Sequence, residues 1–150
     1  MICICVLSSC HSQMAYSTKK KSCIKLFEKA LKAPRESVDI ERGLPNFKNG
    51  LSYLQKALKK DERFWEAHLL SAEYEEYLSN YENAIMHYQA AIKIDPNHTK
   101  TGNTYYQLSK LLLKKGRYKE SLKSLNQFLK FRNSNPDYRR EAIRLKDCAL

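Results

Sequence analysis

The sequence is poor in the residues that most often break secondary structure. Its 150 residues include only 4 glycines and 4 prolines. Because these two residues mark most turns, the composition favours helices joined by short connections. The apolar stretch from Ile2 to Leu7 carries no charge. It is too short to span a bilayer, which takes about 20 residues.

Motifs for catalysis are also missing. The sequence has no glycine-rich phosphate loop and no nucleophile elbow. The four histidines are His11, His68, His87 and His98, and none forms an i, i+4 ligand pair with a neighbouring carboxylate. His87 follows Met86 on a predicted helix and is expected to be a partly exposed surface residue. We therefore expect no enzyme activity, no cofactor and no metal site.

The cysteines do not form a disulfide pattern. Their number is odd, 5, and three of them, Cys3, Cys5 and Cys10, lie in the first ten residues. These three and His11 are a conceivable zinc ligand set. They lack a second ligand pair separated by a turn, so a zinc site is not expected.

The chain is strongly basic. With 27 Lys and Arg against 16 Asp and Glu, its formal net charge is +11. Short basic groups such as Lys19 to Lys21 are most simply solvated helix faces. An acidic partner would offset the repulsion between these charges. No nucleic-acid motif accompanies the basic groups, and the aromatic residues lie at core spacing.

A helical packing pattern recurs along the chain. Residues 81, 84, 88 and 91 are Tyr, Ala, Tyr and Ala, and residues 118, 121, 125 and 128 are Tyr, Ser, Leu and Phe. A third copy consists of Phe47, Gly50, Leu54 and Ala57. This spacing describes one face of a helix, and a period of about 34 residues indicates stacked helix-turn-helix units.

The same pattern predicts the helices and their ends. They are expected over residues 18–33, 46–60, 64–78, 81–94, 103–115, 118–131 and 136–149, with an enlarged loop over 34–46. Pro34 is expected to end the first helix, Gly116 to provide a left-handed turn, and Asn135 to cap the last helix. Ser71 and Glu75 occupy positions where apolar residues are expected, which suggests a stripe displaced to Leu70 and Tyr74.

These features resemble the tetratricopeptide repeat. The residues that carry the resemblance are Ala72, Tyr81, Ala84, Tyr88, Ala91 and Pro96, then Tyr105, Leu108, Ser109, Leu112, Gly116, Tyr118, Ser121, Leu125 and Phe128. The resemblance implies an all-α fold, a right-handed superhelix of antiparallel helix pairs with a C-terminal capping helix. The domain would cover residues 21–150, with an irregular unit at 21–62, units at 63–98 and 99–132, and the cap at 135–149.

The resemblance also implies a function. In this family the first helix of each unit lines a concave groove that binds other proteins, so an extended peptide or a helix is the expected partner. The groove residues expected here are Glu66, Leu69, Glu73, Glu76, Tyr77, Asn103, Tyr106, Lys110, Leu113 and Lys114. They would give the groove an acidic half and a basic half.

The N-terminus resembles a bacterial lipoprotein signal. Leu7, Ser8 and Ser9 precede Cys10, the expected lipidation site, so residues 1–9 are interpreted as a truncated signal and residues 10–20 as a tether. The whole chain is similar to the N-terminal repeats of Bacteroidetes envelope lipoproteins, some of which serve in type IX secretion or gliding. This implies a periplasm-facing protein anchored to the outer membrane. The alternative is a cytoplasmic or nucleic-acid-associated adaptor.

Overall fold

Helices make up most of the chain. A computed structural model describes residues 16–36, 38–39, 44–45, 47–131 and 135–148. The helices within these ranges are α1 (Lys21–Glu36), α2 (Phe47–Lys60), α3 (Trp65–Tyr77), α4 (Tyr81–Ile94), α5 (Thr101–Lys114), α6 (Tyr118–Lys130) and α7 (Pro136–Cys148). Two-residue strands, β1 (Val38–Asp39) and β2 (Leu44–Pro45), pair in antiparallel fashion inside the expected enlarged loop.

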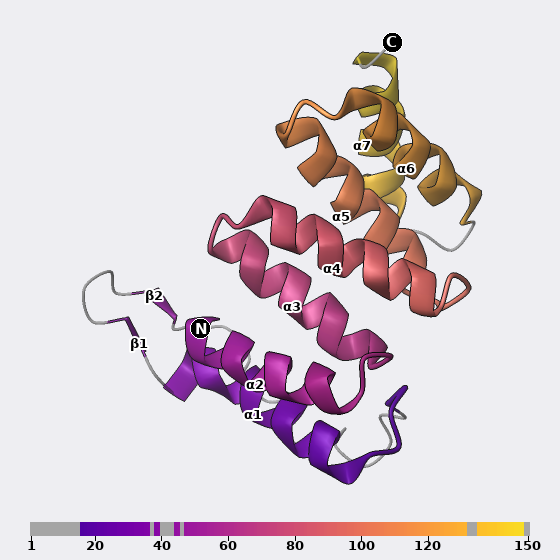
Figure 1. The fold of residues 1–150 in the computed structure, drawn as a ribbon. Helices are drawn as coiled ribbons and strands as arrows, with labels where there is room; N and C mark the ends of the chain where they lie inside the picture. The colour runs from indigo at the N-terminus through magenta and orange to yellow at the C-terminus, as the bar shows by residue number, and fades with distance from the viewer. Residues whose placement is uncertain (1–15, 37, 40–43, 46, 132–134, 149–150) are drawn as a thin grey trace, which may run out of the picture.

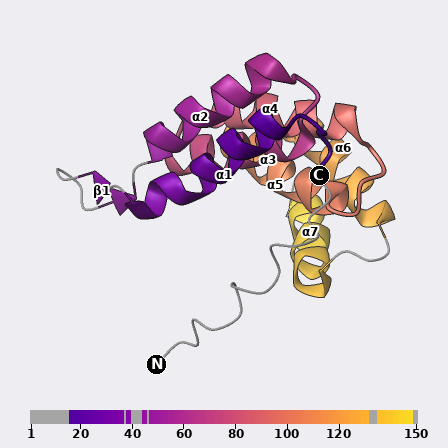
Figure 2. The same ribbon diagram turned by 90° about the horizontal axis from the view of Figure 1, so that it is seen from below.

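The helices pack as successive antiparallel pairs. The most extensive contacts join α1 to α2, α3 to α4, and α5 to α6, while α2 also contacts α3 and α4 contacts α5. Figure 1 shows the pairs stacked in chain order, with α1 and α7 at opposite ends, and Figure 2 shows the same stack from below, from the side of α1. Because each unit packs mainly against its neighbours in sequence, the arrangement is that of a helical repeat.

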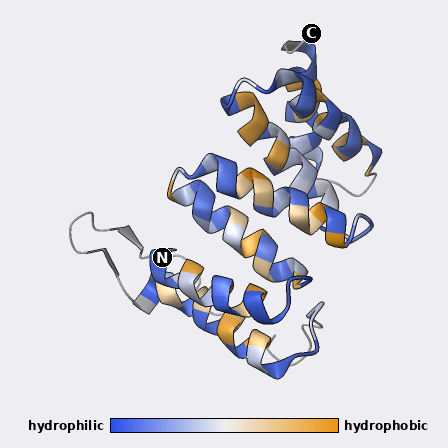
Figure 3. Ribbon diagram, viewed as in Figure 1, coloured by the Kyte–Doolittle hydropathy of each residue, from blue (hydrophilic) through white to orange (hydrophobic). Residues whose placement is uncertain are grey.

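The apolar residues lie at intervals along the helices. Figure 3 shows hydrophobic and hydrophilic residues alternating along the ribbons, as expected for helices with one buried face. Within the described ranges, no helix combines the length and the apolar character needed to cross a membrane.

The sequence predicted that the first helix ends at Pro34. This prediction is wrong, because α1 continues to Glu36. A proline has no backbone N–H, so it leaves the carbonyl group four residues earlier, that of Ala30, without its helical partner. The hydroxyl group of Tyr74 in α3 donates a hydrogen bond to this carbonyl oxygen at 3.0 Å. A residue 44 positions away thus supplies the missing donor.

The same tyrosine explains a glycine in α2. A Cβ atom placed on Gly50 would lie 2.5 Å from Cε2 of Tyr74 and 3.3 Å from the carbonyl oxygen of Ala30. Only a residue without a side chain allows this approach of α2 to the ring. The small residue in the copy of the pattern at residues 47–57 therefore has a packing role.

Residues 16–18 are docked on the first two units. The hydroxyl of Ser17 donates a hydrogen bond of 2.5 Å to the Glu66 carboxylate. It accepts a hydrogen bond of 3.0 Å from the backbone N–H of Trp65. The hydroxyl of Thr18 donates to Asp61 at 2.5 Å, which lowers the pKa of that carboxyl group. This part of the expected tether of residues 10–20 is therefore held against the body of the protein.

α3 is buried on more than one side. Leu70 and Tyr74 belong to the core shared with α1 and α2, as the displaced stripe predicted. Ser71 and Glu75 are nevertheless buried as well. The Glu75 carboxylate accepts a hydrogen bond from the Asn80 side-chain amide at 2.7 Å, so its burial is compensated.

The turns inside the two regular units have the same geometry. Gly116, between α5 and α6, has a φ of 71°, as predicted for a left-handed turn. Ser79, at the corresponding position between α3 and α4, has a φ of 63°. Glycine adopts this conformation freely, whereas serine does so at a cost.

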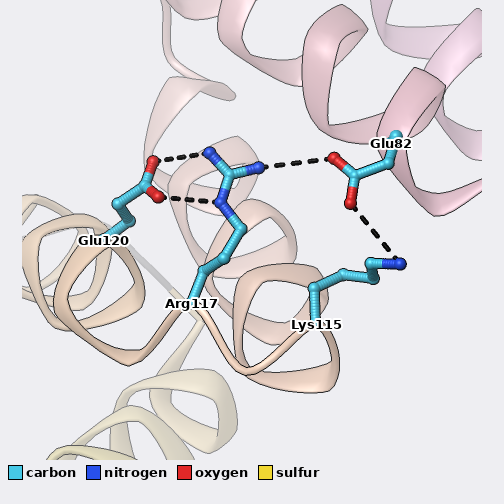
Figure 4. Close-up of polar contacts among 4 residues, drawn as sticks. All are labelled: Glu82, Lys115, Arg117 and Glu120. Carbon is cyan, nitrogen blue, oxygen red and sulfur yellow. Dashed lines mark hydrogen bonds and ion pairs between the residues drawn. The ribbon is translucent and has the colours of Figure 1, made fainter.

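Ion pairs on the surface join the two regular units (Figure 4). Glu82 at the start of α4 lies 3.5 Å from the Lys115 ammonium group and 3.4 Å from the Arg117 guanidinium group. Arg117 also donates two hydrogen bonds of 2.7 Å to Glu120. All four side chains are solvent-accessible, so these pairs contribute orientation more than stability.

The last helix begins as the sequence predicted. The side-chain oxygen of Asn135 accepts a hydrogen bond from the Asp137 N–H at 2.8 Å, and Pro136 is the first helical residue. α7 covers the end of the stack through Tyr138, whose ring stacks on Tyr106 of α5 with centroids 4.6 Å apart.

Candidate protein-binding groove

A cavity of about 560 Å³ lies between α3, α4 and α5. We call it the groove. Its lining residues are Glu73, Glu76, Tyr77, Tyr81, Tyr88, Gln107, Lys110 and Lys114. Figure 1 shows how these three helices follow one another in the middle of the stack. The groove therefore belongs to both regular units and depends on how they pack.

The α3 wall of the groove is acidic. Partial burial raises the pKa of the Glu73 carboxyl group, and the nearby carboxylate of Glu76 raises it further, while Lys100 opposes the shift. The hydroxyl group of Tyr88 lies 3.3 Å from the Glu76 carboxylate, to which it donates. Burial, together with these carboxylates, raises the pKa of Tyr88. A cation entering here would offset the cost of keeping the partly buried Glu73 carboxylate charged.

The α5 wall is basic. The ammonium group of Lys114 donates a hydrogen bond of 2.6 Å to the Tyr81 hydroxyl and lies 4.0 Å from the centre of that ring. This hydrogen bond lowers the pKa of Tyr81. Lys110, one turn earlier, is exposed and lies 3.4 Å from the side-chain oxygen of Gln107. An anionic group of a partner would find two ammonium groups on this wall.

The charges of the two walls do not neutralise each other by direct contact. Among the ion pairs of the described residues, none joins Glu73 or Glu76 to Lys110 or Lys114. Tyr77 stands at the rim with 72% of its surface exposed, and its ring is stacked on Phe47 at 4.7 Å. The groove thus offers separate acidic, basic and aromatic surfaces to one occupant.

Half of the ten residues predicted from the sequence line the groove. Those that do are Glu73, Glu76, Tyr77, Lys110 and Lys114. Those that do not are Glu66, Leu69, Asn103, Tyr106 and Leu113.

Two of the five residues outside the groove contact the segments that precede α1 and follow α6. Glu66 accepts the hydrogen bonds of Ser17. Tyr106 is only 1% exposed because α7 covers it, and its hydroxyl group donates to Glu141. The expectation that Tyr106 faces a partner is therefore corrected, because the ring belongs to the core beneath α7.

Three lining residues were missed by the sequence reasoning. Tyr81 and Tyr88 were assigned to packing because they match the repeat pattern, and Gln107 was not among the predicted groove residues. The Tyr88 ring is buried, but its hydroxyl end reaches the groove and bonds to Glu76. A tyrosine at a packing position often presents its polar end at a surface, and this property was the available signal.

The architecture and the groove define a helical repeat scaffold. Residues 65–134 match the family model of the tetratricopeptide repeat. This supports the assignment of the two regular units to the tetratricopeptide repeat family. No curated protein sequence matches the chain.

Solved structures show the same fold over most of the chain. The tetratricopeptide domain of Arabidopsis OM64 has a TM-score of 0.68 at 16% identity, and the match covers 85% of this chain and 96% of that domain. The first such domain of Spaghetti (RPAP3), bound to an HSP90 peptide, has a TM-score of 0.67 at 15% identity, with coverages of 85% and 92%. The Yersinia enterocolitica chaperone SycD, in complex with a YopD peptide, gives 0.66 at 14%, with 84% and 90%.

These likenesses confirm the predicted fold class, an all-α tetratricopeptide-like superhelix. At such low identity they describe the fold alone. Folds of this kind are in general non-catalytic interaction modules. The family match over residues 65–134 supports the coarser functional prediction, an interaction scaffold.

Proposed function

We propose that this chain is a non-catalytic scaffold that binds an extended segment of another protein in the groove. The observation that carries the proposal is the groove itself. It places carboxylates on α3, ammonium groups on α5 that form no ion pair with those carboxylates, and the exposed ring of Tyr77 around one cavity. A peptide with charged groups of both signs fits such a surface better than an apolar small molecule does.

Neighbours of the same fold support this proposal. The domain of Spaghetti is solved with an HSP90 peptide, and SycD is solved with a peptide of the translocator YopD. Their sequences differ too much from this chain for the peptide to be transferred. They support the class of ligand, an extended protein segment, and leave its side chains to be selected by Glu73, Glu76, Lys110 and Lys114.

Selection from a random peptide library tests the proposal. Peptides are selected on the wild-type chain, and their affinities are then measured for Tyr77→Ala, for Lys110→Glu, and for the control Met86→Ala. Met86 is an exposed apolar residue of α4 outside the groove lining. We expect both groove variants to lose about tenfold or more in affinity and the control to retain it. Equal binding by all three variants would place the peptide site elsewhere.

We further propose that the scaffold belongs to a cell-envelope lipoprotein with a role in outer-membrane secretion or peptidoglycan-associated assembly. The support is the sequence Leu7-Ser8-Ser9-Cys10, which lies outside the described residues, and the resemblance to Bacteroidetes envelope lipoproteins. Cys10 would carry the lipid and hold the groove on the periplasmic side of the outer membrane.

Metabolic labelling with a palmitate analogue tests this location. The chain is expressed from its own gene, as the wild type and as Cys10→Ala. Label on the wild type alone is the expected result. Absence of label from both proteins would favour the cytoplasmic or nucleic-acid-associated alternative. In that case, binding to nucleic acid should weaken steeply with added salt.

A further inference from the structure

One face of α3 presents two carboxylates and an aromatic ring to the groove. Glu73, Glu76 and Tyr77 all line it, and the last two follow Glu73 by three and four positions along the helix. Residues at this spacing are neighbours on a helix surface, with Cβ atoms about 5–6 Å apart. The three side chains therefore form one continuous surface, which a single chemical group of an occupant can contact as a whole.

The two carboxylates have no cation of this chain in contact with them. Among the ion pairs of the described residues, none includes Glu73 or Glu76. Burial in the groove wall raises the pKa of the Glu73 carboxyl group, and Lys100 opposes this shift from a distance. In the part of the chain that the structure describes, the Glu76 carboxylate accepts one hydrogen bond, of 3.3 Å, from the Tyr88 hydroxyl. A carboxylate can accept about four, so both groups keep acceptor sites for a donor from outside the chain.

The ring of Tyr77 has one face available to an occupant. Phe47 of α2 stacks on the other face, with ring centroids 4.7 Å apart and an angle of 2° between the planes. Tyr77 is nevertheless 72% exposed. The ring of Tyr81, by contrast, already has the Lys114 ammonium group 4.0 Å from its centre. Because Phe47 holds the Tyr77 ring in place, little conformational entropy is lost when a planar group stacks on its open face.

A guanidinium group matches this surface better than an ammonium group does. The guanidinium group is planar and weakly hydrated, and it presents N–H donors in a fixed arrangement. It can therefore stack on a tyrosine ring and donate hydrogen bonds to carboxylates at the same time. An ammonium group is compact and strongly hydrated, so it gains less from the ring.

We propose that Glu73, Glu76 and Tyr77 form a binding site for one arginine side chain of the extended segment that occupies the groove. This inference rests on the proposed function, since it names the residue that anchors the segment on α3. The guanidinium group stacks on Tyr77 and donates hydrogen bonds to the two carboxylates. Lys110 and Lys114 repel the same cation from the α5 wall, so the arginine is directed to α3.

The test uses a probe that is small enough to report on this site alone. Acetyl-Gly-Arg-Gly-amide is titrated onto the full chain, and backbone amide shifts are followed by NMR. Two matched probes carry citrulline, which has the same shape without the charge, or lysine, which has the charge without the planar group. We expect shifts centred on residues 73–77. Binding should be at least about fivefold weaker for the citrulline probe and about two- to fivefold weaker for the lysine probe.

Single variants locate the site. Glu73→Gln and Glu76→Gln should each weaken binding of the arginine probe by about threefold or more, because each removes a charge beside the guanidinium group. Glu62→Gln is the matched control, since Glu62 is exposed and lies outside the groove lining, and it should bind as the wild type does. Tyr77→Leu should bring the arginine and lysine probes to about equal affinity, because it removes the stacking surface.

Equal affinity of the wild type for the arginine and citrulline probes would overturn the proposal. An effect of Glu62→Gln as large as that of Glu73→Gln would do the same. The peptides selected from the library separate this result from a failure of the proposed function. Groove-bound peptides without an enriched arginine would overturn the arginine site and leave the scaffold function standing. Shifts at residues 73–77 with the arginine probe, when no peptide is selected, would support the site and count against the wider function.

Discussion

α3 and α5 are the first helices of successive units. Almost every pair of equivalent residues in these two helices differs in its side chain. The helices that follow them begin at Tyr81 and Tyr118, 37 residues apart. With this offset, Glu73 corresponds to Lys110, and Tyr77 corresponds to Lys114. One pair of equivalent groove positions, Glu73 and Lys110, thus carries opposite charge, and the other pairs an aromatic ring with an ammonium group.

The buried faces of the two helices differ as well. Leu112 in α5 corresponds to Glu75 in α3, and both are buried. α5 is held by apolar contacts with α4 and α6, whereas α3 combines apolar contacts with a hydrogen-bonded carboxylate. The comparison teaches that the repeat pattern specifies where a helix lies, while the residues at these positions can be apolar or polar if their partners match.

The largest effect is expected from truncating the apolar member of this pair. Leu112 is only 1% exposed in the core between α4 and α5. Leu112→Ala should lower the free energy of unfolding by about 2–5 kcal/mol, because it removes buried contacts and leaves a cavity. Urea unfolding followed by circular dichroism measures the change. A loss below about 1 kcal/mol would mean that α5 is not held as described.

A second prediction concerns alkaline pH and α3. Burial raises the pKa of Tyr74 to about 12, above its ordinary value of 10.0. Below pH 10 the phenol is protonated in both folded and unfolded chains. As the pH rises from 10 to 12, the unfolded chain ionises first, so about 2–3 kcal/mol of stability is lost.

The matching variant is Tyr74→Phe. It removes the hydrogen bond to the Ala30 carbonyl and costs about 1–3 kcal/mol at neutral pH, because that buried acceptor is left without the donor. Its stability should fall less steeply between pH 10 and 12 than that of the wild type. Tyr88 and Tyr106 also have raised pKa values but are present in both proteins. Identical slopes would contradict the role assigned to Tyr74.

The polar member of the buried pair gives a third, smaller effect. Glu75→Ala leaves the side-chain amide of Asn80 without its acceptor and should cost about 1–3 kcal/mol. Glu75→Gln keeps an oxygen for the Asn80 amide and loses only the longer hydrogen bond from Asn83 at 3.4 Å, so it should cost less than Glu75→Ala. Chemical unfolding of both variants provides the measurement. An equal loss in the two would show that the hydrogen bond does not stabilise α3.

The turns after α3 and α5 give the smallest effect. Ser79→Gly should raise the free energy of unfolding by about 0.5–1 kcal/mol, because glycine adopts a positive φ without steric strain. Gly116→Ala should lower it by about 1 kcal/mol, and a Cβ there meets no other atom within 4 Å. Thermal unfolding of both variants would show shifts of opposite sign. Shifts of the same sign would contradict the backbone explanation.

Local chemistry predicted the regular parts of the molecule. Gly116, Asn135 and Pro136 act within a few residues of themselves, and their roles were evident from their neighbours in sequence. Pro34 was misinterpreted because the hydroxyl group that compensates it comes from Tyr74, in another helix.

The groove residues were predicted only in part, because helical periodicity locates the face of a helix but not its contacts with distant residues. Glu73 and Lys110 lie on first helices and off the packing stripe, so helical periodicity located them. Tyr106 has the same spacing but is covered by α7, and the contact of His68 with His87 depends on how α3 and α4 pack. Such contacts between distant residues require the three-dimensional structure.

The most direct test of the account is to map a peptide selected from the random library onto the protein by NMR. Backbone amide shifts are recorded for the wild type and for the double variant Lys110→Glu/Lys114→Glu. The account predicts that shifts cluster at residues 73–77 of α3 and 110–114 of α5, and that the double variant loses them. Shifts that cluster around Met86 or Ile143 instead, or that persist in the double variant, would contradict it.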